Sequence, residues 1–194
     1  MKIAILSDIH DNIWYLSAAL TNLQAAELLI CCGDLCSPFV VSLLASGFAD
    51  RPVHIVFGNN DGDLFRIARV ASRYPHIHLQ GELFEAEIDG KRIAANHYDQ
   101  IAAGLAHSGK YDLVCYGHNH HYQIEKVGQT LAINPGAIMG YDPLNSQDIP
   151  ATFVIVDLQT GTATGYQVVA PSKNGLRVAP ISANRPGISK PAAA

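Results

Sequence analysis

The sequence has little charge, few aromatic residues and no long hydrophobic run. Of its 194 residues, 15% are charged and 8% are aromatic. The net charge of -4 at pH 7 gives no basic surface of the kind that attracts a nucleic-acid backbone or an anionic membrane. No run approaches the roughly 20 apolar residues that a membrane-spanning helix needs. We therefore expect neither a membrane location nor a stable nucleic-acid partner.

The sequence also has no CxxC motif, and we expect no secretory leader. The four cysteines, Cys31, Cys32, Cys36 and Cys115, contain no CxxC pair, and two of them lie side by side in the apolar run LLICCG. We interpret them as thiols of buried strands. The N-terminal segment reaches Asp8 before the apolar core of a signal peptide could form. These features predict a cytoplasmic protein.

The first half of the chain alternates short apolar strands with amphipathic helices. The segments KIAILS (2–7), LLICC (28–32) and VHIVFG (53–58) favour strands, and helical patterns around 12–25 and 39–47 separate them. Such βαβ units predict a largely buried sheet. Since 48% of the residues are hydrophobic, the chain can form one sizeable core.

The second half of the chain favours strands joined by turns. Asp89-Gly90 separates LFEAEI from KRIAAN, which is the signal of a two-residue hairpin. A helix is expected over residues 99–108, and it is followed by the short strands DLVCYG, HYQIEKV, TLAINPG, TFVIVD and TATGYQVV. We expect these five strands in a second, mostly antiparallel sheet that packs against the first.

The predicted fold class is α/β: a four-layer α-β-β-α sandwich of two mixed β-sheets flanked by helices. One domain is expected over residues 1–170. Residues 171–194 are rich in Pro, Ala, Ser and Gly and have no clear period. They predict an extended or mobile C-terminal tail.

Polar motifs follow the predicted strands. In chain order they are Asp8-x-His10, Gly33-Asp34, Gly58-Asn59-x-Asp61, His97, Gly117-His118-x-His120 and Asn134-Pro135-Gly136. Each alone is weak, because Asp and Asn are common at strand ends and helix caps. Together they are specific, because Asp, Asn and His supply the oxygen and imidazole ligands that suit divalent Mn, Fe, Co, Ni or Zn. The motifs also fall at the carboxyl ends of strands, where active sites of open α/β sheets lie.

The order and spacing of these motifs resemble the calcineurin-like metallophosphoesterase superfamily, and within it the small stand-alone microbial phosphodiesterases. The resemblance covers residues 1–140. It implies a first metal held by Asp8, His10, Asp34 and His120, and a second metal held by Asp34, Asn59, His97 and His118. Asp34 then bridges two divalent cations, for which manganese is expected and nickel, cobalt, iron and zinc are alternatives.

The resemblance implies a phosphodiesterase in which a hydroxide between the two metals attacks phosphorus in line, with Asp34 and Asn59 as catalytic ligands. The expected substrate is a small phosphate ester, with nucleotide-like esters included, and a homo-oligomer is expected. Phosphomonoester hydrolysis at the same site is the nearest alternative. A non-catalytic scaffold is the alternative of a different class, because the superfamily includes the retromer scaffold subunit. Against it, every type of metal ligand is present here.

Three features depart from the family pattern. Asn60 stands where many relatives have His or Cys, and an amide cannot act as a general acid. Asp61, the next residue, is then the candidate catalytic proton donor, although nearby cations would favour its ionised form. Tyr98 and Asp99 stand where relatives often have Gly-His, which changes the shape of the pocket. We expect no cap domain, so substrate choice is expected to come from short loops or a neighbouring subunit.

Three other features near the motifs are given supporting roles. Asn134-Pro135-Gly136 is expected to fix the orientation of the metal ligands. His121 is expected to project away from His120, since neighbouring residues of an extended segment point to opposite sides. Trp14 is interpreted as a packing residue of the first helix, with a place at the mouth of the site as the alternative.

Overall fold

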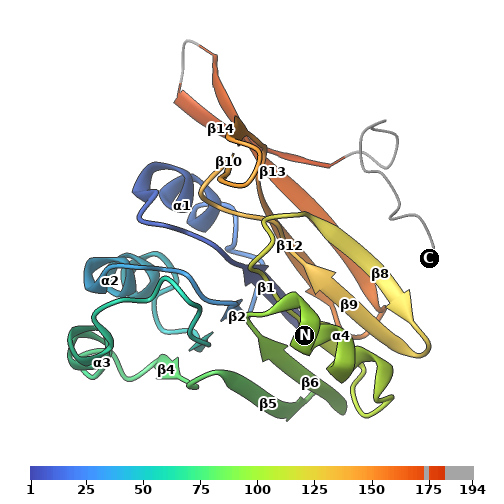
Figure 1. Cartoon of the computed structure of the whole chain (residues 1–194). Helices are drawn as coiled ribbons and strands as arrows, with labels where there is room; N and C mark the ends of the chain where they lie inside the picture. Colours follow the sequence, from blue (N-terminus) through green and yellow to red (C-terminus); the bar gives the residue numbers. More distant parts are fainter. Residues whose placement is uncertain (173–174, 182–194) are drawn as a thin grey trace.

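The computed structural model describes residues 1–172 and 175–181, which form two β-sheets packed face to face (Figure 1). The first sheet has seven strands, in the order β14 (Gly175–Pro180), β13 (Thr162–Ser172), β12 (Ala151–Asp157), β1 (Lys2–Leu6), β2 (Leu28–Cys31), β3 (Val53–Ile55) and β4 (Ile77–Leu79). Strands β1 to β4 are parallel, and β12 to β14 continue the sheet in antiparallel pairs.

The second sheet is mixed. Its order is β5 (Leu83–Ile88), β6 (Lys91–Asn96), β7 (Leu113–Cys115), β9 (Thr130–Asn134) and β8 (Gln123–Val127). The two outer pairs are antiparallel, whereas β6, β7 and β9 run parallel. The Asp89-Gly90 hairpin between β5 and β6 is confirmed, and both residues have positive φ, at 52° and 71°. A small hairpin, β10 (Tyr141–Asp142) and β11 (Gln147–Asp148), lies apart from both sheets.

The expectation of a mostly antiparallel second sheet is wrong. The segments TFVIVD and TATGYQVV form β12 and β13, which join the first sheet because β12 pairs with the open edge of β1. Alternating apolar residues identify a strand, but they do not say which sheet edge the strand will meet.

Helices cover the outer faces of both sheets, which confirms the four-layer α-β-β-α arrangement. They are α1 (Ile13–Leu20), α2 (Pro38–Gly47), α3 (Leu64–Ala71) and α4 (Asp99–His107). In Figure 1, α1, α2 and α3 lie together on the left of the view, and α4 lies beside β6 on the other side. No helix of the described residues is both long and apolar enough to cross a membrane.

Local signals fix where the helices on the first sheet begin. The Asn12 side chain accepts a hydrogen bond from the backbone N–H of Tyr15 at the start of α1. The Asp63 side chain does the same for Arg66 at the start of α3. Pro38 opens α2, where its fixed φ suits the first helical turn. Each of these helices therefore starts directly after a polar loop.

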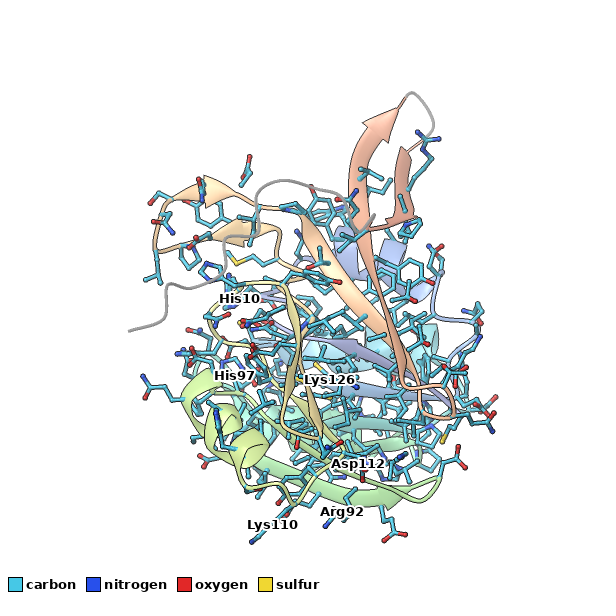
Figure 2. The ribbon with its side chains drawn as sticks, turned by 90° about the vertical axis from the view of Figure 1, so that its right-hand side faces the viewer. His10, Arg92, His97, Lys110, Asp112 and Lys126 are labelled. Atoms are coloured by element: carbon cyan, nitrogen blue, oxygen red, sulfur yellow. The ribbon has the colours of Figure 1, made fainter. Side chains whose placement is uncertain are left out.

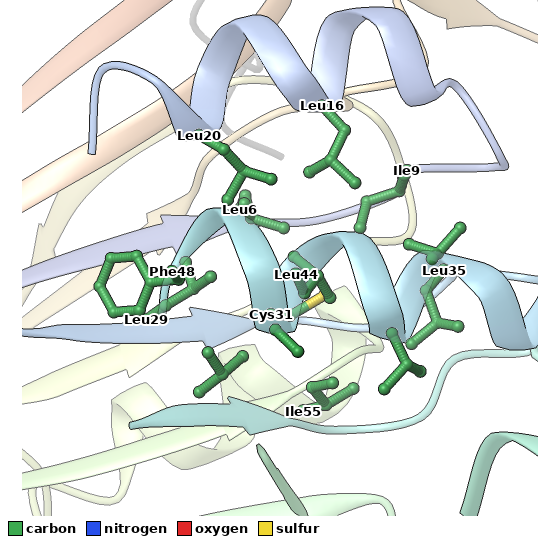
Figure 3. Close-up of a cluster of buried hydrophobic side chains, with 14 of the residues drawn as sticks. Leu6, Ile9, Leu16, Leu20, Leu29, Cys31, Leu35, Leu44, Phe48 and Ile55 are labelled. Carbon is green, nitrogen blue, oxygen red and sulfur yellow. The ribbon is translucent and has the colours of Figure 1, made fainter. Parts of the chain in front are cut away.

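Alternate side chains of β1 pack in two different parts of the core, one on each face of the sheet. Ile3 and Ile5 face the second sheet, whereas Ala4 and Leu6 face the helices. Figure 3 shows the helix-facing cluster, in which Leu6 lies among side chains of β2, β3, α1 and α2. Because both faces of this sheet are buried, the sequences of its central strands are continuous apolar runs.

The sheet continues past the expected end of the domain at residue 170. β13 extends to Ser172, and β14 pairs with it in antiparallel register. Residues 175–180 are therefore a strand of the first sheet, which departs from the expected tail over 171–194. Residues 182–194 lie outside the described residues, so the expectation for them and the domain boundary itself stay predictions.

Leu44 gives a test of the helix-facing core. Leu44 of α2 is fully buried, whereas Leu144 in the β10–β11 hairpin is 86% exposed. We expect Leu44→Ala to lower the free energy of unfolding by about 2–5 kcal/mol, through lost burial and the cavity that remains. The matched Leu144→Ala should change it by less than about 0.5 kcal/mol. Urea unfolding followed by circular dichroism measures both, and equal losses would contradict the packing described here.

Candidate metal centre

The candidate ligands lie in loops that follow five parallel strands. Asp8 and His10 follow β1, Asp34 follows β2, Asn59 follows β3, His97 follows β6, and His118 and His120 follow β7. Both sheets thus bring the carboxyl ends of their parallel strands to one place. Figure 2 shows His10 and His97 on one side of the molecule, away from Arg92 and Lys110.

The first group of side chains gathers around Asp8. The Asp8 Oδ1 atom lies 3.4 Å from His120 Nε2 and 3.9 Å from His10 Nε2. Ligand atoms of these three residues all lie within 4.8 Å of one another. The His10 Nε2 atom is buried and has no hydrogen-bond partner among the described residues. A buried nitrogen without a partner is what a bound cation would satisfy.

The second group gathers around His97. Its Nε2 atom lies 3.5 Å from Asp34 Oδ2 and 3.1 Å from Asn59 Oδ1. The same Asn59 oxygen lies 2.9 Å from His118 Nδ1. Asp34 Oδ2 also lies 3.4 Å from His10 Nε2 of the first group, so one carboxylate contacts both groups. All seven predicted metal ligands are therefore brought together, and Asp34 lies between the two sets.

Backbone carbonyls fix which imidazole nitrogen faces the carboxylates. His97 Nδ1 lies 2.8 Å from the carbonyl of Cys32, and His120 Nδ1 lies 2.8 Å from the carbonyl of Tyr141. A carbonyl only accepts, so each Nδ1 carries the donated hydrogen and Nε2 is left to act as a ligand. His10 differs, because its Nδ1 lies 3.6 Å from the Cys36 sulfur.

The electrostatics of the centre favour positive charge. Burial alone would raise the pKa of Asp8, but the neighbouring histidines outweigh it and lower this pKa. Burial likewise opposes ionisation of Asp34, whose pKa is nevertheless lowered by His97. Burial would lower the pKa values of His97 and His120, but the Asp34 and Asp8 carboxylates raise both. The same carboxylates would attract a divalent cation.

The ligand loops are strained, and three glycines let them approach one another. Ten non-glycine residues of the described chain have positive φ, and seven lie in these loops: Asp8, His10, Asp11, Asp34, Cys36, His118 and His120. A Cβ on Gly58 would lie 2.2 Å from Asp34 Oδ1, and one on Gly117 would lie 2.5 Å from Asp8 Oδ2. A Cβ on Gly33 would lie 2.8 Å from His97 Nδ1. Glycine is therefore required beside Asp34, Asp8 and His97.

Buried side chains and backbone hydrogen bonds hold the strained loops. Ile9, between Asp8 and His10, and Leu35, after Asp34, are both fully buried in the helix-facing cluster (Figure 3). The backbone N–H groups of Ile9 and His10 both donate to the carbonyl of Asp34, at 2.9 and 3.0 Å. The first two ligand loops are thus joined to each other and anchored in the core.

The Asp61 carboxylate holds the backbone of the ligand loops, and the catalytic role that we expected for Asp61 stays a prediction. Its carboxylate accepts hydrogen bonds from the backbone N–H groups of Asp34, Cys36 and Gly58, at 3.1, 2.8 and 2.8 Å. Burial raises the pKa of Asp61, while these donors favour its ionised form. With its oxygens occupied in this way, the Asp61 carboxyl fixes the backbone of two ligand loops.

Asn60 contacts the shared carboxylate directly. Its backbone N–H donates to Asp34 Oδ1 at 2.8 Å, and its side-chain Nδ2 donates to Asp34 Oδ2 at 2.8 Å. Asn60 is exposed, so its amide also faces the surface of the centre. Sequence reasoning placed Asn60 near the leaving group but did not predict this contact.

The Asn134-Pro135-Gly136 loop supports the histidines of the β7 loop. Asn134 Nδ2 donates to the carbonyl of Gly117 at 3.0 Å and to Asn119 Oδ1 at 2.8 Å. Asn119 Nδ2 donates in turn to Asp99 Oδ2 at 3.2 Å. Asp99 thus contacts the loop that carries His118, and the expected orienting role of Asn134 matches its contacts.

Residues around the centre differ in whether they face it. His121 is exposed, and its Nε2 lies 4.0 Å from Asp142, outside both ligand groups. The Tyr98 ring lies 5.2 Å from the His97 ring and 5.1 Å from the His118 ring, so Tyr98 borders the centre. Trp14 is 70% exposed, which contradicts the interpretation of Trp14 as a packing residue.

Comparisons with known proteins place these features in a family context. Residues 1–161 match the family described as the calcineurin-like phosphoesterase superfamily domain. A phosphodiesterase of Methanocaldococcus jannaschii is 33% identical over 147 residues, which cover 73% of this chain and 86% of that relative. A solved structure described as a novel archaeal phosphodiesterase has a TM-score of 0.76 at 27% identity, and the match covers 87% of this chain and 100% of that one. Vps29 of Entamoeba histolytica, solved with Zn²⁺, shares the fold, with a TM-score of 0.63 at 19% identity over 93% of this chain and 98% of that one.

Gly58 gives a test of the close approach at the centre. We expect Gly58→Ala to displace the Asp34 carboxylate and to lower metal-dependent hydrolysis by about 10- to 100-fold, since small misplacements of reacting groups are costly. The control is Gly104→Ala in α4, because a Cβ there meets no atom within 4 Å. Gly104→Ala should keep full activity and raise the free energy of unfolding by about 1 kcal/mol. Steady-state rates and bound metal measure the effect, and a fully active Gly58→Ala protein would refute the contact.

Proposed function

Because the chain belongs to the calcineurin-like phosphoesterase superfamily and is a metal-dependent phosphoric ester hydrolase, we propose that it is a phosphodiesterase with two divalent cations bridged by Asp34. The observation that supports this most is the position of Asp34 Oδ2, which lies 3.4 Å from His10 Nε2 and 3.5 Å from His97 Nε2. One carboxylate oxygen between two histidines of different ligand groups is suited to a bridging role.

The proposed ligands of the two cations follow the two groups of side chains. Asp8, His10, Asp34 and His120 would hold the first cation, and Asp34, Asn59, His97 and His118 would hold the second. This donor set of imidazoles, carboxylates and one amide fits manganese, and it also fits nickel, cobalt, iron or zinc. The buried, unpartnered His10 Nε2 supports the fit. When bound, such a pair activates a water for in-line attack on phosphorus and offsets the charge that develops.

The residues of the chain supply positioning. His97 and His120 are held by backbone carbonyls, so their Nε2 atoms need little rearrangement to act as ligands. Asp61 fixes the backbone of the Asp34 and Asn59 loops from behind. Asn60 orients the Asp34 carboxylate and offers an amide hydrogen at the surface of the centre. Among these four residues we assign none as a general acid.

A preference for diesters is supported by Asn60 and by the phosphodiesterase of M. jannaschii, which is 33% identical. Without a proton donor, the site suits esters whose leaving group departs readily as an anion. The scaffold alternative has less support, because the similarity to Vps29 at 19% identity shows the fold alone. The complete set of ligand types in this chain favours the enzyme.

Asp34→Asn tests the bridge. We expect this variant to bind fewer than two cations per chain and to lose activity by roughly 100-fold or more, since even groups that only orient metal ligands contribute about 10- to 100-fold. The matched control is Asp50→Asn, which removes the same charge at an exposed residue where Asn tolerates the positive φ of 60°. Elemental analysis of manganese-loaded protein and hydrolysis of a diester and a monoester panel measure both. If Asp34→Asn kept two tightly bound cations and full rate, the dinuclear proposal would be wrong.

Asn60 predicts a steep dependence on the leaving group. Because the amide cannot release a proton, log(kcat/KM) should fall steeply as the leaving-group pKa rises across a series of aryl and alkyl diesters. Asn60→His should accelerate the poorest leaving groups by about 10-fold or more and the best ones little, since a general acid contributes about 10²–10⁴-fold. Asn60→Gln is the control, because it keeps an amide and should keep the slope. A flat wild-type plot would show that another group protonates the leaving oxygen.

A further inference from the structure

Each helix that packs on the first sheet presents an exposed aromatic side chain at its second residue. These are Trp14 of α1, Phe39 of α2 and Phe65 of α3, which are 70%, 51% and 77% exposed. We call these three residues the aromatic rim. Large aromatic side chains are usually mostly buried, so three exposed ones at the same helical position are unusual.

The aromatic rim adjoins the metal centre, because each helix starts directly after a ligand loop. Hydrogen bonds also join these loops in a row. The Asp11 carboxylate accepts from the backbone N–H and the hydroxyl of Ser37, at 3.0 and 2.7 Å, which joins the start of α1 to the start of α2. The backbone N–H of Cys36 donates to Asp61 at 2.8 Å, which joins the start of α2 to the loop before α3. The three helix starts therefore lie side by side at the edge of the sheet that carries the centre (Figure 1).

A phosphodiester bound at the metal centre would bring its ester substituents near the aromatic rim. In a diester both oxygen substituents extend outward from phosphorus, and the starts of α1, α2 and α3 follow the joined ligand loops of the first sheet. Aromatic faces bind flat rings by stacking, and they do so for any base because every base has a π-face. Tyr98, which follows β6 of the second sheet, lies 5.2 and 5.1 Å from the His97 and His118 rings.

We infer that the aromatic rim binds a flat ring, such as a nucleobase. This ring belongs to the ester substituent that stays on phosphorus after cleavage. The inference rests on the proposed function, and it names the substrate class: phosphodiesters that carry a nucleoside or aryl group in addition to the leaving group. Stacking on one side chain corresponds to about 5- to 100-fold in kcat/KM.

The kinetic test uses two diesters with the same leaving group. These are thymidine 5′-(p-nitrophenyl) phosphate and methyl p-nitrophenyl phosphate, which differ only in the group that is retained. The wild type should prefer the thymidine ester by about 5- to 100-fold. Trp14→Ala, Phe39→Ala and Phe65→Ala together should bring this ratio close to one, mainly through KM, and should change the rate for the methyl ester by less than about 2-fold.

Ring-retaining substitutions separate stacking from general surface effects. Trp14→Phe and Phe65→Tyr keep a flat ring and should keep most of the preference, whereas Phe65→Leu keeps apolar area without a ring and should lose part of it. Leu144→Ala is the positional control, because Leu144 is 86% exposed on the β10–β11 hairpin, outside the rim. An unchanged ratio in the triple alanine variant would overturn the inference.

Fluorescence gives a second test that does not need hydrolysis. Trp14 is the only tryptophan of the sequence, so its emission reports on the rim directly. We expect thymidine 5′-monophosphate to quench this emission and methyl phosphate to leave it unchanged. If the protein hydrolysed no diester but thymidine 5′-monophosphate still quenched the emission, the proposed function would be refuted and the rim would be supported. Absence of quenching would overturn the rim alone.

A second copy of this chain is the competing occupant of the rim. Sedimentation of the wild type and of the triple alanine variant distinguishes the two cases. If the variant dissociated while the ratio of the two esters stayed unchanged, the rim would be an interface between copies, and the inference would be wrong. An unchanged oligomeric state with a lowered ratio would support it.

Discussion

Two buried carboxylates held close together are the constraint on which the rest of the centre depends. Asp8 and Asp34 are almost fully buried, and they share a group with His97 whose ligand atoms lie within 4.8 Å of one another. Like charges at this separation repel, and burial adds a desolvation penalty. The surroundings offset both with imidazoles and backbone N–H donors, and the buried Ile9 and Leu35 keep the loops from relaxing. Strained φ values at the ligands persist because the core and the joined loops over-determine them.

The sequence predicts those parts of the fold that local patterns determine. The strands before Asp8 and Asp34 follow from apolar runs, and the β5–β6 hairpin follows from Asp89-Gly90, where both residues adopt the positive φ that such a turn requires. The partner of β12 could not be predicted in this way, because it depends on which sheet edge is open after the chain has folded. The strand β14 was missed because its sequence has weak strand character, although it pairs with β13 in the folded chain.

The ligand set follows from residue types and order, but the way the ligands converge does not. Asp8 and His10 reach the same group through a turn in which both have positive φ, and neither residue type nor order indicates such a turn. The contacts of Asp61 depend on three amides from two separate loops of the chain, which no local pattern records. The Cys36 sulfur near His10 is a similar case, since proximity here comes from packing of the β1 and β2 loops.

Catalytic geometry and substrate choice lie in adjacent but separable parts of the same loops. Asp11, Ser37 and Asp61 make the hydrogen bonds that join the loops, and all three precede their helices. The exposed aromatic residues lie at the second helical position, beyond these contacts, and they are directed away from the core. A change of side chain at the second helical position alters the surface that faces the ester substituent. Such a change leaves the metal ligands and the hydrogen bonds that join their loops intact. The substrate can thus vary at the helix starts, because the loops that hold the ligands are fixed by other residues.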